Sequence, residues 1–437
     1  MNSSRVVIVG GGISGLSAGV ALSERGIPVI VLDQKPVMGG RAYSFYDATS
    51  GDIVDNGQHV LIAGYSRTFN FLRRIGTLQQ LTIQPSLSIL FHHPQRGFRR
   101  FTLPHLPSPF HFLAGILTCS LWSFHDRLKL LRAGASFLKT ERRMNEELRD
   151  LTIKQWLDGA GQDEELQRTF WNPLAIAIMN EQPSVASALT FATSLRKAFL
   201  GSRLSAAIAL PTTGLNELYV QHAAEFITSH GGEIRCNGDV DSVSVKAKNV
   251  LGVQLRGGEM VEGRAVILAV PPHKLRPLLP AEIPFDPTIF SWSPIVSVHL
   301  WFEKDFMNDD FVGIIGRTTQ WLFNRRKINR EAGKGGHVSA VISAAHELVD
   351  KSNEETLATV LTDIRSVYPQ VTAPTHFLVI REKRATYSSN PTVDLQRPGH
   401  KTSMENLYLA GDWTATGFPA TIEGAVISGE RCAAEIV

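Results

Sequence analysis

Three glycines near the start of the chain have a spacing that can form a phosphate-binding turn. Gly10, Gly12 and Gly15 make a GxGxxG motif directly after the apolar residues Val6–Val9. The first glycine permits a tight turn, the second lets a pyrophosphate approach the backbone, and the third lets a helix pack closely on a strand. The free amide groups and the dipole at the start of the following helix would attract the phosphates.

A carboxylate follows at the end of the next apolar run, Val29–Leu32. Asp33 lies about twenty residues beyond the motif, where an acidic side chain would accept hydrogen bonds from ribose hydroxyls. Glycine turns also occur for structural reasons, so the motif alone is a weak indication. Strand, glycines, helix and carboxylate together predict dinucleotide binding, and they do not separate NAD from FAD.

A second glycine pair favours FAD. Gly40 and Arg41 end the segment MGGR shortly after Asp33. They would add a backbone N–H group and a guanidinium to the same pyrophosphate. The alternative is an ordinary turn with a solvated arginine.

The C-terminal block supplies a matching set of residues. Gly411 and Asp412 follow an apolar run and would place a carboxylate near a ribityl chain. Thr421 and Ile422 would open a helix whose N–H groups face the flavin edge on which negative charge collects. The alternative is a strand, loop and helix with a buried aspartate cap, but that does not explain why both ends of the chain carry cofactor motifs.

These motifs require elements that bring the two ends of the chain together. Val6–Val9, a helix with small residues on one face, and Val29–Leu32 form one βαβ unit. Val266–Val270 and Leu407–Ala410 are further apolar runs typical of buried parallel strands, and a helix is expected from Thr421 onward. The expected fold class is α/β, with a Rossmann-like FAD-binding domain of the two-dinucleotide-binding-domain type.

The expected FAD-binding domain is discontinuous and comprises residues 1–90, 205–285 and 400–437. The intervening segments, 91–204 and 286–399, are rich in aromatic residues and proline and are expected to form an inserted α+β substrate domain. Within them, residues 126–138 have the pattern of an amphipathic helix.

Size and composition restrict the function classes. A chain of 437 residues is expected to form at least two domains. A net charge of +3, without a basic arm interleaved with aromatics, argues against nucleic acid as a partner. Cys119, Cys236 and Cys432 have neither disulfide-framework nor metal-site spacing, so no metal is expected. The apolar start is a strand rather than a signal peptide, and we expect a cytoplasmic protein.

The motifs at both ends resemble those of the flavin amine oxidase and phytoene desaturase superfamily. Five internal segments together resemble the hydroxysqualene dehydroxylases: DNGQHV (55–60), WNPLAIAIMN (171–180), QWLFNR (320–325), REKRATY (381–387) and AGDWTATGFPATIEGA (410–425). The resemblance covers essentially the whole chain. It implies a bacterial enzyme of squalene and hopanoid biosynthesis that uses reduced FAD to remove the hydroxyl group of hydroxysqualene, giving squalene.

The resemblance also assigns the residues that contact a non-covalent FAD: Gly10, Gly12, Gly15, Asp33, Gly40, Arg41, Gly57, Val240, Gly411 and Asp412, with Thr421 and Ile422 beside the ring. Val240 matches a strand whose backbone pairs with adenine, although a strand valine is usually a core residue. The chain departs from amine oxidases in two places. Apolar residues around Leu300 replace a flavin-side lysine, and Thr421 replaces an aromatic residue, so amine oxidation is disfavoured.

Removal of an allylic hydroxyl group requires a proton donor and a dry pocket. His59 is the first candidate for the donor, with a structural histidine as the alternative. Arg384 is either a catalytic group that holds the leaving hydroxide or a buried arginine paired with Glu382. Glu423 is expected to cap a helix or support the flavin. Four aromatic residues are candidates for lining the pocket, although core packing is the commoner role: Phe170, Trp171, Trp321 and Phe323.

A long isoprenoid substrate such as hydroxysqualene would dissolve in a membrane. Residues 105–138 contain the segment HFLAGILTCSLWSF, which is too short to span a bilayer but suits a surface element on the inner face of the cytoplasmic membrane. Neighbouring basic residues would meet anionic headgroups: Arg96, Arg99, Arg100, Arg127, Lys129 and Arg132. The alternative is a buried helix of the substrate domain. Upstream enzymes of squalene synthesis are further candidate partners.

Two other functions remain open. A carotenoid desaturase or isomerase shares the fold, the flavin and a polyprenoid substrate, and the five internal segments are what separates it. A non-catalytic carrier of prenyl groups or lipids also shares the fold. Such carriers tend to lose the flavin loops, whereas this chain keeps them at both ends.

Overall fold

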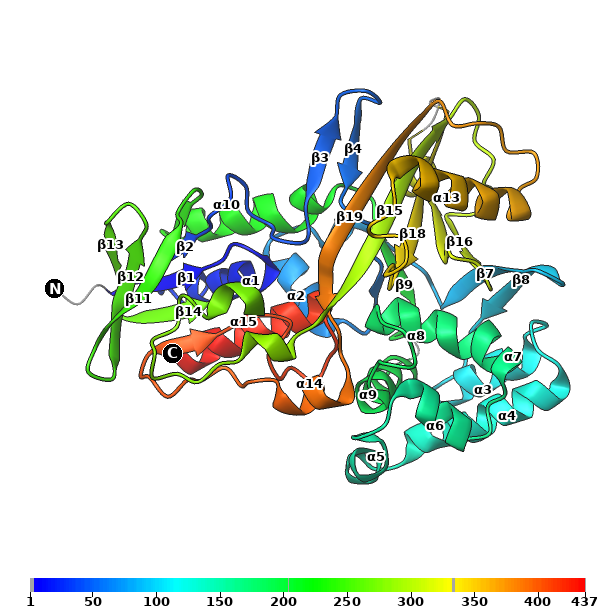
Figure 1. The fold of residues 1–437 in the computed structure, drawn as a ribbon, viewed down its shortest axis with the longest axis horizontal. Coiled ribbons are helices and arrows are strands. Elements are labelled where there is room, and N and C mark those ends of the chain that lie inside the picture. Colours follow the sequence, from blue (N-terminus) through cyan, green and yellow to red (C-terminus); the bar gives the residue numbers. More distant parts are fainter. Residues whose placement is uncertain (1–3, 203, 332–334, 437) are drawn as a thin grey trace.

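A parallel sheet joins the two ends of the chain in the computed structural model, which describes residues 4–202, 204–331 and 335–436 (Figure 1). Residues 1 and 437, the outer bounds of the expected FAD-binding domain, lie outside this range, as do 203 and 332–334. Within the described part the sheet has five strands, in the order β10-β2-β1-β14-β20. Their bounds are β1 Val6–Val9, β2 Val29–Leu32, β10 Glu233–Arg235, β14 Ala265–Leu268 and β20 Leu407–Leu409.

Both faces of this sheet are covered, which explains why the strands inside it, β1, β2 and β14, are continuously apolar. Helices α1 (Ile13–Ser23), α10 (His222–Ser229) and α15 (Ile422–Ile436) pack in one core with one face. The antiparallel strands β11 (Val240–Lys246), β12 (Asn249–Leu255) and β13 (Met260–Glu262) cover the other face. In Figure 1, α15 lies beside α1, so the last helix is adjacent to the first. The expected Rossmann-like α/β class is confirmed.

A second sheet is built from the segments between the pieces of the first. Its order in the described chain is β19-β15-β18-β17-β16-β7-β8. The strands are β7 Ser88–His93, β8 Gly97–Thr102, β15 Trp292–Phe302, β16 Phe311–Ile314, β17 Trp321–Asn324, β18 Gly336–Ser343 and β19 His376–Tyr387. Helix α13 (Asn353–Val367) packs on one face of this sheet.

A helical lobe packs against the other face, around one apolar core (Figure 1). Its helices are α3 Phe110–Thr118, α4 Phe124–Gly134, α5 Glu141–Leu148, α6 Ile153–Gly159, α7 Glu164–Leu166, α8 Asn172–Met179 and α9 Ala188–Phe199. The helix expected over residues 126–138 begins earlier, at Phe124, because Ser123 and Asp126 form a capping box. It ends at Gly134, and a 3₁₀ turn, Ala135–Leu138, completes the segment.

Smaller elements connect the two sheets. They are the hairpin β3 (Ser44–Asp47) and β4 (Asp52–Asp55), the small sheet of β5 (Leu61–Ile62), β6 (Leu81–Ile83) and β9 (Ile208–Pro211), and the helices α2 (Ser66–Arg74), α11 (Pro272–Leu275), α12 (Arg325–Ile328) and α14 (Pro391–Gln396). Single 3₁₀ or π turns span Leu78–Gln80, Gln167–Trp171, Asn216–Gln221 and Pro287–Ile289.

Candidate active site

A cavity of about 900 Å³ extends from the glycine turn after β1 into the helical lobe. One half is lined by polar groups and glycines from both ends of the chain. The other half is lined by apolar side chains of the second sheet and the lobe, among them Phe91, Phe101, Trp122, Ile178, Phe199 and Ile295. Of the residues assigned to FAD from the sequence, all but Gly15 line the cavity, as do both catalytic candidates, His59 and Arg384.

The three glycines of the turn differ in the atoms that a side chain at each position would contact. A Cβ atom on Gly10 would lie 2.4 Å from the carbonyl oxygen of Ala269, and one on Gly15 would lie 1.9 Å from that of Gly10. The protein itself therefore requires glycine at these two positions. For a Cβ atom on Gly12, the nearest atom would be the Gly40 Cα, 4.0 Å away. The free space around this position belongs to the cavity. We call this open space around Gly12 the cradle, and it fits a bound pyrophosphate.

Asp33 lies at the end of β2 and is held by the backbone. Its Oδ2 accepts the Gly11 N–H at 2.7 Å, and its Oδ1 accepts the Lys35 N–H at 2.8 Å. The carboxylate thus stabilises the glycine turn as well as facing the cavity. Val240 begins β11 at the same end of the cavity and is buried.

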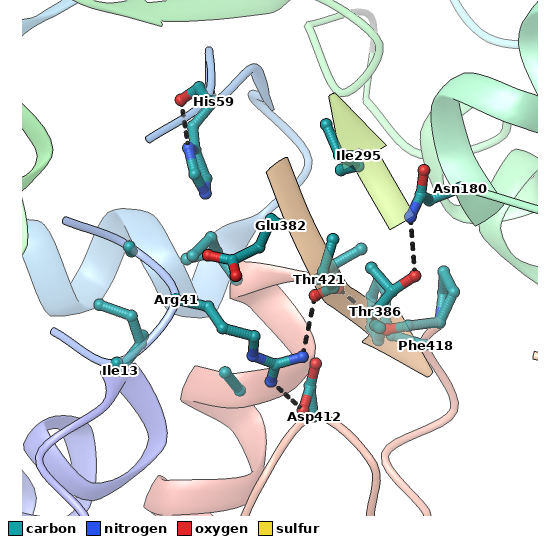
Figure 2. Close-up of a pocket in the computed structure, with 18 of the residues that line it drawn as sticks. Ile13, Arg41, His59, Asn180, Ile295, Glu382, Thr386, Asp412, Phe418 and Thr421 are labelled. Atoms are coloured by element: carbon teal, nitrogen blue, oxygen red, sulfur yellow. Dashed lines mark hydrogen bonds and ion pairs between the residues drawn. The ribbon is translucent and has the colours of Figure 1, made fainter. Parts of the chain in front are cut away.

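Arg41 links the two ends of the chain (Figure 2). Its Nη2 donates to Asp412 Oδ1 at 2.7 Å, and its Nη1 donates to the Ala385 carbonyl at 3.0 Å. Burial opposes the charge, but Asp412 and Glu382 outweigh it and raise the pKa of Arg41. A permanent cation therefore stands beside the open glycine turn, as binding of a pyrophosphate requires.

The start of α15 is capped from within, because Thr421 Oγ1 accepts the Gly424 N–H at 3.1 Å. Glu423 does not cap this helix. Its buried carboxylate accepts the Thr68 N–H at 2.8 Å and the Arg67 N–H at 3.1 Å, at the start of α2. Burial raises the pKa of Glu423, against the effect of these hydrogen bonds. Glu423 thus fastens α2 to α15, behind the cavity wall.

The two catalytic candidates have different environments. The Nδ1–H of His59 donates to the Gly57 carbonyl at 2.9 Å, and burial lowers the pKa of His59. The neutral ring therefore presents Nε2 to the cavity as an acceptor and is poorly suited to donate a proton. Arg384 is exposed, so the alternative of a buried arginine was wrong. Glu382, considered from the sequence only as a partner of Arg384, itself lines the cavity.

Sequence reasoning missed the residue that holds the loop of His59. Arg325 is 2% exposed, and its Nη2 donates to Asp55 Oδ2 at 3.0 Å. Its Nη1 donates to the side chain of Gln58, so one guanidinium fixes both ends of the segment that carries Gly57. In the sequence, Arg325 ends the segment QWLFNR, which gives no indication of its partner.

A buried histidine next to this ion pair predicts acid sensitivity. Burial and then Arg325 lower the pKa of His299 to about 4. In the unfolded chain the pKa of this histidine is ~6.5. Between pH ~6.5 and pH ~4, the unfolded chain therefore binds a proton at His299 that the folded chain does not bind. Because of His299, the free energy of unfolding is therefore roughly 3 kcal/mol larger above pH ~6.5 than below pH ~4. This part of the stability is lost as the pH falls from ~6.5 towards ~4. Urea unfolding at pH 7 and pH 5 measures the slope.

The matched variants for this prediction are His299→Gln and His125→Gln. His299 is buried and His125 is exposed. His299→Gln should flatten the pH dependence of the unfolding free energy, while His125→Gln keeps the parent slope. Equal slopes in the two variants would contradict the assignment.

The apolar half contains three of the four predicted aromatic residues, Phe170, Trp321 and Phe323. Trp171 is instead a core residue whose indole N–H donates to Gln162 Oε1 at 2.9 Å. Asn180 ends α8 in the left-handed conformation, with φ of 47°. Its amide nitrogen donates to Thr386 Oγ1 at 2.9 Å, which ties the lobe to β19 (Figure 2).

The described cavity lining contains no cysteine. Cys119 and Cys432 are buried elsewhere, and Cys236 is half-buried. Burial raises the pKa of all three thiols.

The chain is similar in sequence to a known family of flavin enzymes and to several of its members. The family model described as flavin containing amine oxidoreductase matches residues 13–437. The chain is 31% identical to the hydroxysqualene dehydroxylase of Sinorhizobium fredii, over 98% of this chain and 97% of that protein. It is 29% identical to the hydroxysqualene dehydroxylase of Rhodopseudomonas palustris, over 99% and 98%. It is 24% identical to the 15-cis-phytoene desaturase of Synechococcus elongatus, over 99% and 96%.

A solved structure shares the fold. The structure of an oxidoreductase from Methanosarcina mazei matches with a TM-score of 0.75 at 16% identity, covering 97% of this chain and 98% of that chain. At this identity the similarity concerns the arrangement of the elements.

Proposed function

Since this chain belongs to the flavin-containing amine oxidoreductases, and among them to the hydroxysqualene dehydroxylase family, we propose that it removes the hydroxyl group of hydroxysqualene to give squalene. It is an FAD-dependent oxidoreductase. The observation that carries the substrate proposal is the joined cavity, in which the cradle opens directly into a long apolar half.

The residues of the cradle have defined tasks towards FAD. The turn at Gly12 and the Arg41 guanidinium would hold the pyrophosphate, Asp33 the adenosine ribose, and Asp412 the ribityl chain. Thr421 would lie at the ring. The reduced cofactor supplies a hydride.

The apolar half performs two tasks for the reaction. It binds a hydrocarbon chain by removing its surface from water, and it keeps water from a carbon that becomes electron-deficient as the hydroxyl group leaves. The ring faces of Trp321 and Phe170 can stabilise positive charge at that carbon. This supports a polyprenoid alcohol over a small polar amine.

Lipid extraction distinguishes the proposal from a carotenoid desaturase. Cells that lack the protein should accumulate hydroxysqualene, and the wild-type gene should restore squalene. Accumulation of phytoene-like polyenes, with normal squalene, would instead support the desaturase.

A colour test distinguishes the enzyme from a non-catalytic lipid carrier. The purified protein should be yellow, with a flavin spectrum that bleaches on reduction. A colourless protein that cannot be reconstituted with FAD would favour the carrier. Contact with upstream enzymes of squalene synthesis stays a prediction from the family resemblance.

Docking of the lobe on a membrane surface is the finer part of the proposal. Among the described residues, none of the helices combines the length and apolar character needed to cross a bilayer. Helices α3 and α4 nevertheless expose large apolar side chains, with Phe110 59% and Phe124 68% exposed. Five of the six predicted headgroup contacts bond within the chain, namely Arg96, Arg99, Arg100, Arg127 and Lys129. The support for docking is therefore chiefly apolar.

A flotation assay with phospholipid vesicles tests this surface. The double variant Phe110→Asp/Phe124→Asp should lower the vesicle-bound fraction about tenfold or more, because each phenylalanine loses up to about 2 kcal/mol of apolar burial. Leu395→Asp is the control, because Leu395 is exposed on α14, outside the surface. Equal flotation of both variants and the parent protein would count against docking.

A further inference from the structure

An irregularity in β19 lies at the junction of the two halves of the cavity. Ile295 of β15 pairs with Glu382, whereas Ser293 pairs with Thr386, so β19 carries extra residues between these two pairs. Such a bulge redirects side chains and is frequent beside active sites. Glu382, Arg384 and Thr386 line the cavity beside this bulge.

Glu382 stands between the cradle and the apolar half. It shares the lining with Ile295, its cross-strand partner on the apolar side, and it raises the pKa of Arg41 on the cradle side. Figure 2 shows its carboxyl group on the cavity wall, among Arg41, His59 and Thr421. This is where a hydroxyl group on a hydrocarbon would meet the cofactor.

The Glu382 carboxyl group keeps capacity for a ligand. Asn56 Nδ2 donates to its Oε2 at 3.3 Å, which is a long hydrogen bond. Arg41, whose pKa Glu382 helps to raise, is already bonded to Asp412 and the Ala385 carbonyl. Glu382 is thus oriented by an amide, and no guanidinium in the described part of the chain forms an ion pair with it.

The other acidic side chains of the described lining are engaged elsewhere. Asp33 accepts two backbone amides, and Asp412 pairs with Arg41. Asp239 pairs with Arg256 at 3.2 Å, at the adenosine end, and Asp241 is exposed at the start of β11. Glu382 is the carboxyl group that borders the apolar half.

The geometry points to Glu382 as the acid that binds the substrate hydroxyl group and protonates it. This inference rests on the proposed function. The protonated carboxyl group donates its hydrogen bond to the hydroxyl oxygen; the C–O bond breaks, and the proton leaves with the hydroxyl group as water. The electron-deficient carbon would take the hydride that reduced FAD would supply, and Glu382 regains a proton from solvent. His59, with Nε2 as an acceptor, serves as a positioning residue for the same hydroxyl group.

Binding to the oxidised enzyme provides a test that does not depend on turnover. In the parent protein, hydroxysqualene should perturb the flavin spectrum at a concentration about tenfold or more below that needed for squalene. Glu382→Leu should abolish this preference while retaining the flavin, whereas Glu382→Gln should keep most of it, because an amide still donates a hydrogen bond. An unchanged preference in Glu382→Leu would overturn the assignment.

Single turnover of the reduced enzyme tests proton donation. Glu382→Gln should slow flavin reoxidation by hydroxysqualene about 10²- to 10⁴-fold, and Glu382→Asp should recover part of the rate. Arg41 and Tyr43, whose pKa values Glu382 raises, are unchanged in both variants. A parent-like rate in Glu382→Gln would overturn the proposal.

A surface carboxylate near the same strand provides the control. Asp350 is exposed and pairs with Lys383 at 2.7 Å, so Asp350→Asn removes a charge without touching the cavity. It should react as the parent does, and a matching loss of rate in this variant would overturn the assignment of the effect to Glu382. If the parent protein itself fails to react with hydroxysqualene, the proposed function has failed, and the assignment of Glu382 fails with it.

Discussion

Replacement of Arg325 by methionine is expected to lower the free energy of unfolding by about 3–5 kcal/mol. The guanidinium and its partner Asp55 are each 2% exposed, so the variant leaves a carboxylate buried without its counter-charge. The same change releases Gln58 and the loop that carries Gly57 and His59. Urea unfolding measures the stability, and titration with FAD should show weaker binding.

An exposed ion pair gives the matched control for this experiment. Arg142 bonds to Glu146 on the surface of α5, where Arg142 is 89% exposed. Arg142→Met should change stability by less than about 0.5 kcal/mol, because solvent screens exposed pairs. If Arg325→Met is no more destabilising than Arg142→Met, then the buried ion pair of Arg325 and Asp55 does not hold this loop.

Substitution of Gly12 by alanine is expected to separate cofactor binding from folding. The new Cβ atom would meet the Gly40 Cα at 4.0 Å, so the free energy of unfolding of the apoprotein should stay within about 1 kcal/mol of the parent value. The methyl group would occupy cradle space that the pyrophosphate needs. We expect FAD affinity to fall about 10- to 100-fold, as overpacking by one methyl group implies.

Gly159→Ala is the control for this substitution, because nothing lies within 4 Å of a Cβ atom at Gly159 in α6. Flavin fluorescence during titration of the apoprotein gives the dissociation constant of each variant. Parent-like FAD affinity in Gly12→Ala would show that the cofactor does not approach the turn at this point.

The sequence was most informative where a motif has a local physical cause. The glycines at 10, 12 and 15 have fixed spacing because strand, turn and helix are consecutive, and β1 and β2 have the bounds that were expected. Asp33 follows from the same unit. The helix of the lobe that was expected at 126–138 was shifted because its capping box begins at Ser123.

Residues whose role depends on distant partners were beyond sequence reasoning. Arg325 meets Asp55 across 270 positions, and no local pattern encodes that pair. Glu423 looked like a cap for its own helix but caps α2, 355 positions earlier at Thr68. Glu382 was considered only as a partner of Arg384, because its place in the cavity lining depends on the pairing of two long strands.

We propose that FAD bound in this cradle delivers reducing equivalents to a triterpenoid alcohol. The most direct test is to reduce the purified flavoprotein without oxygen, mix it with hydroxysqualene, and record the flavin spectrum while lipids are extracted. We predict that the flavin is reoxidised and that one squalene forms for each flavin. A flavin that stays reduced, with hydroxysqualene recovered intact, would contradict the account.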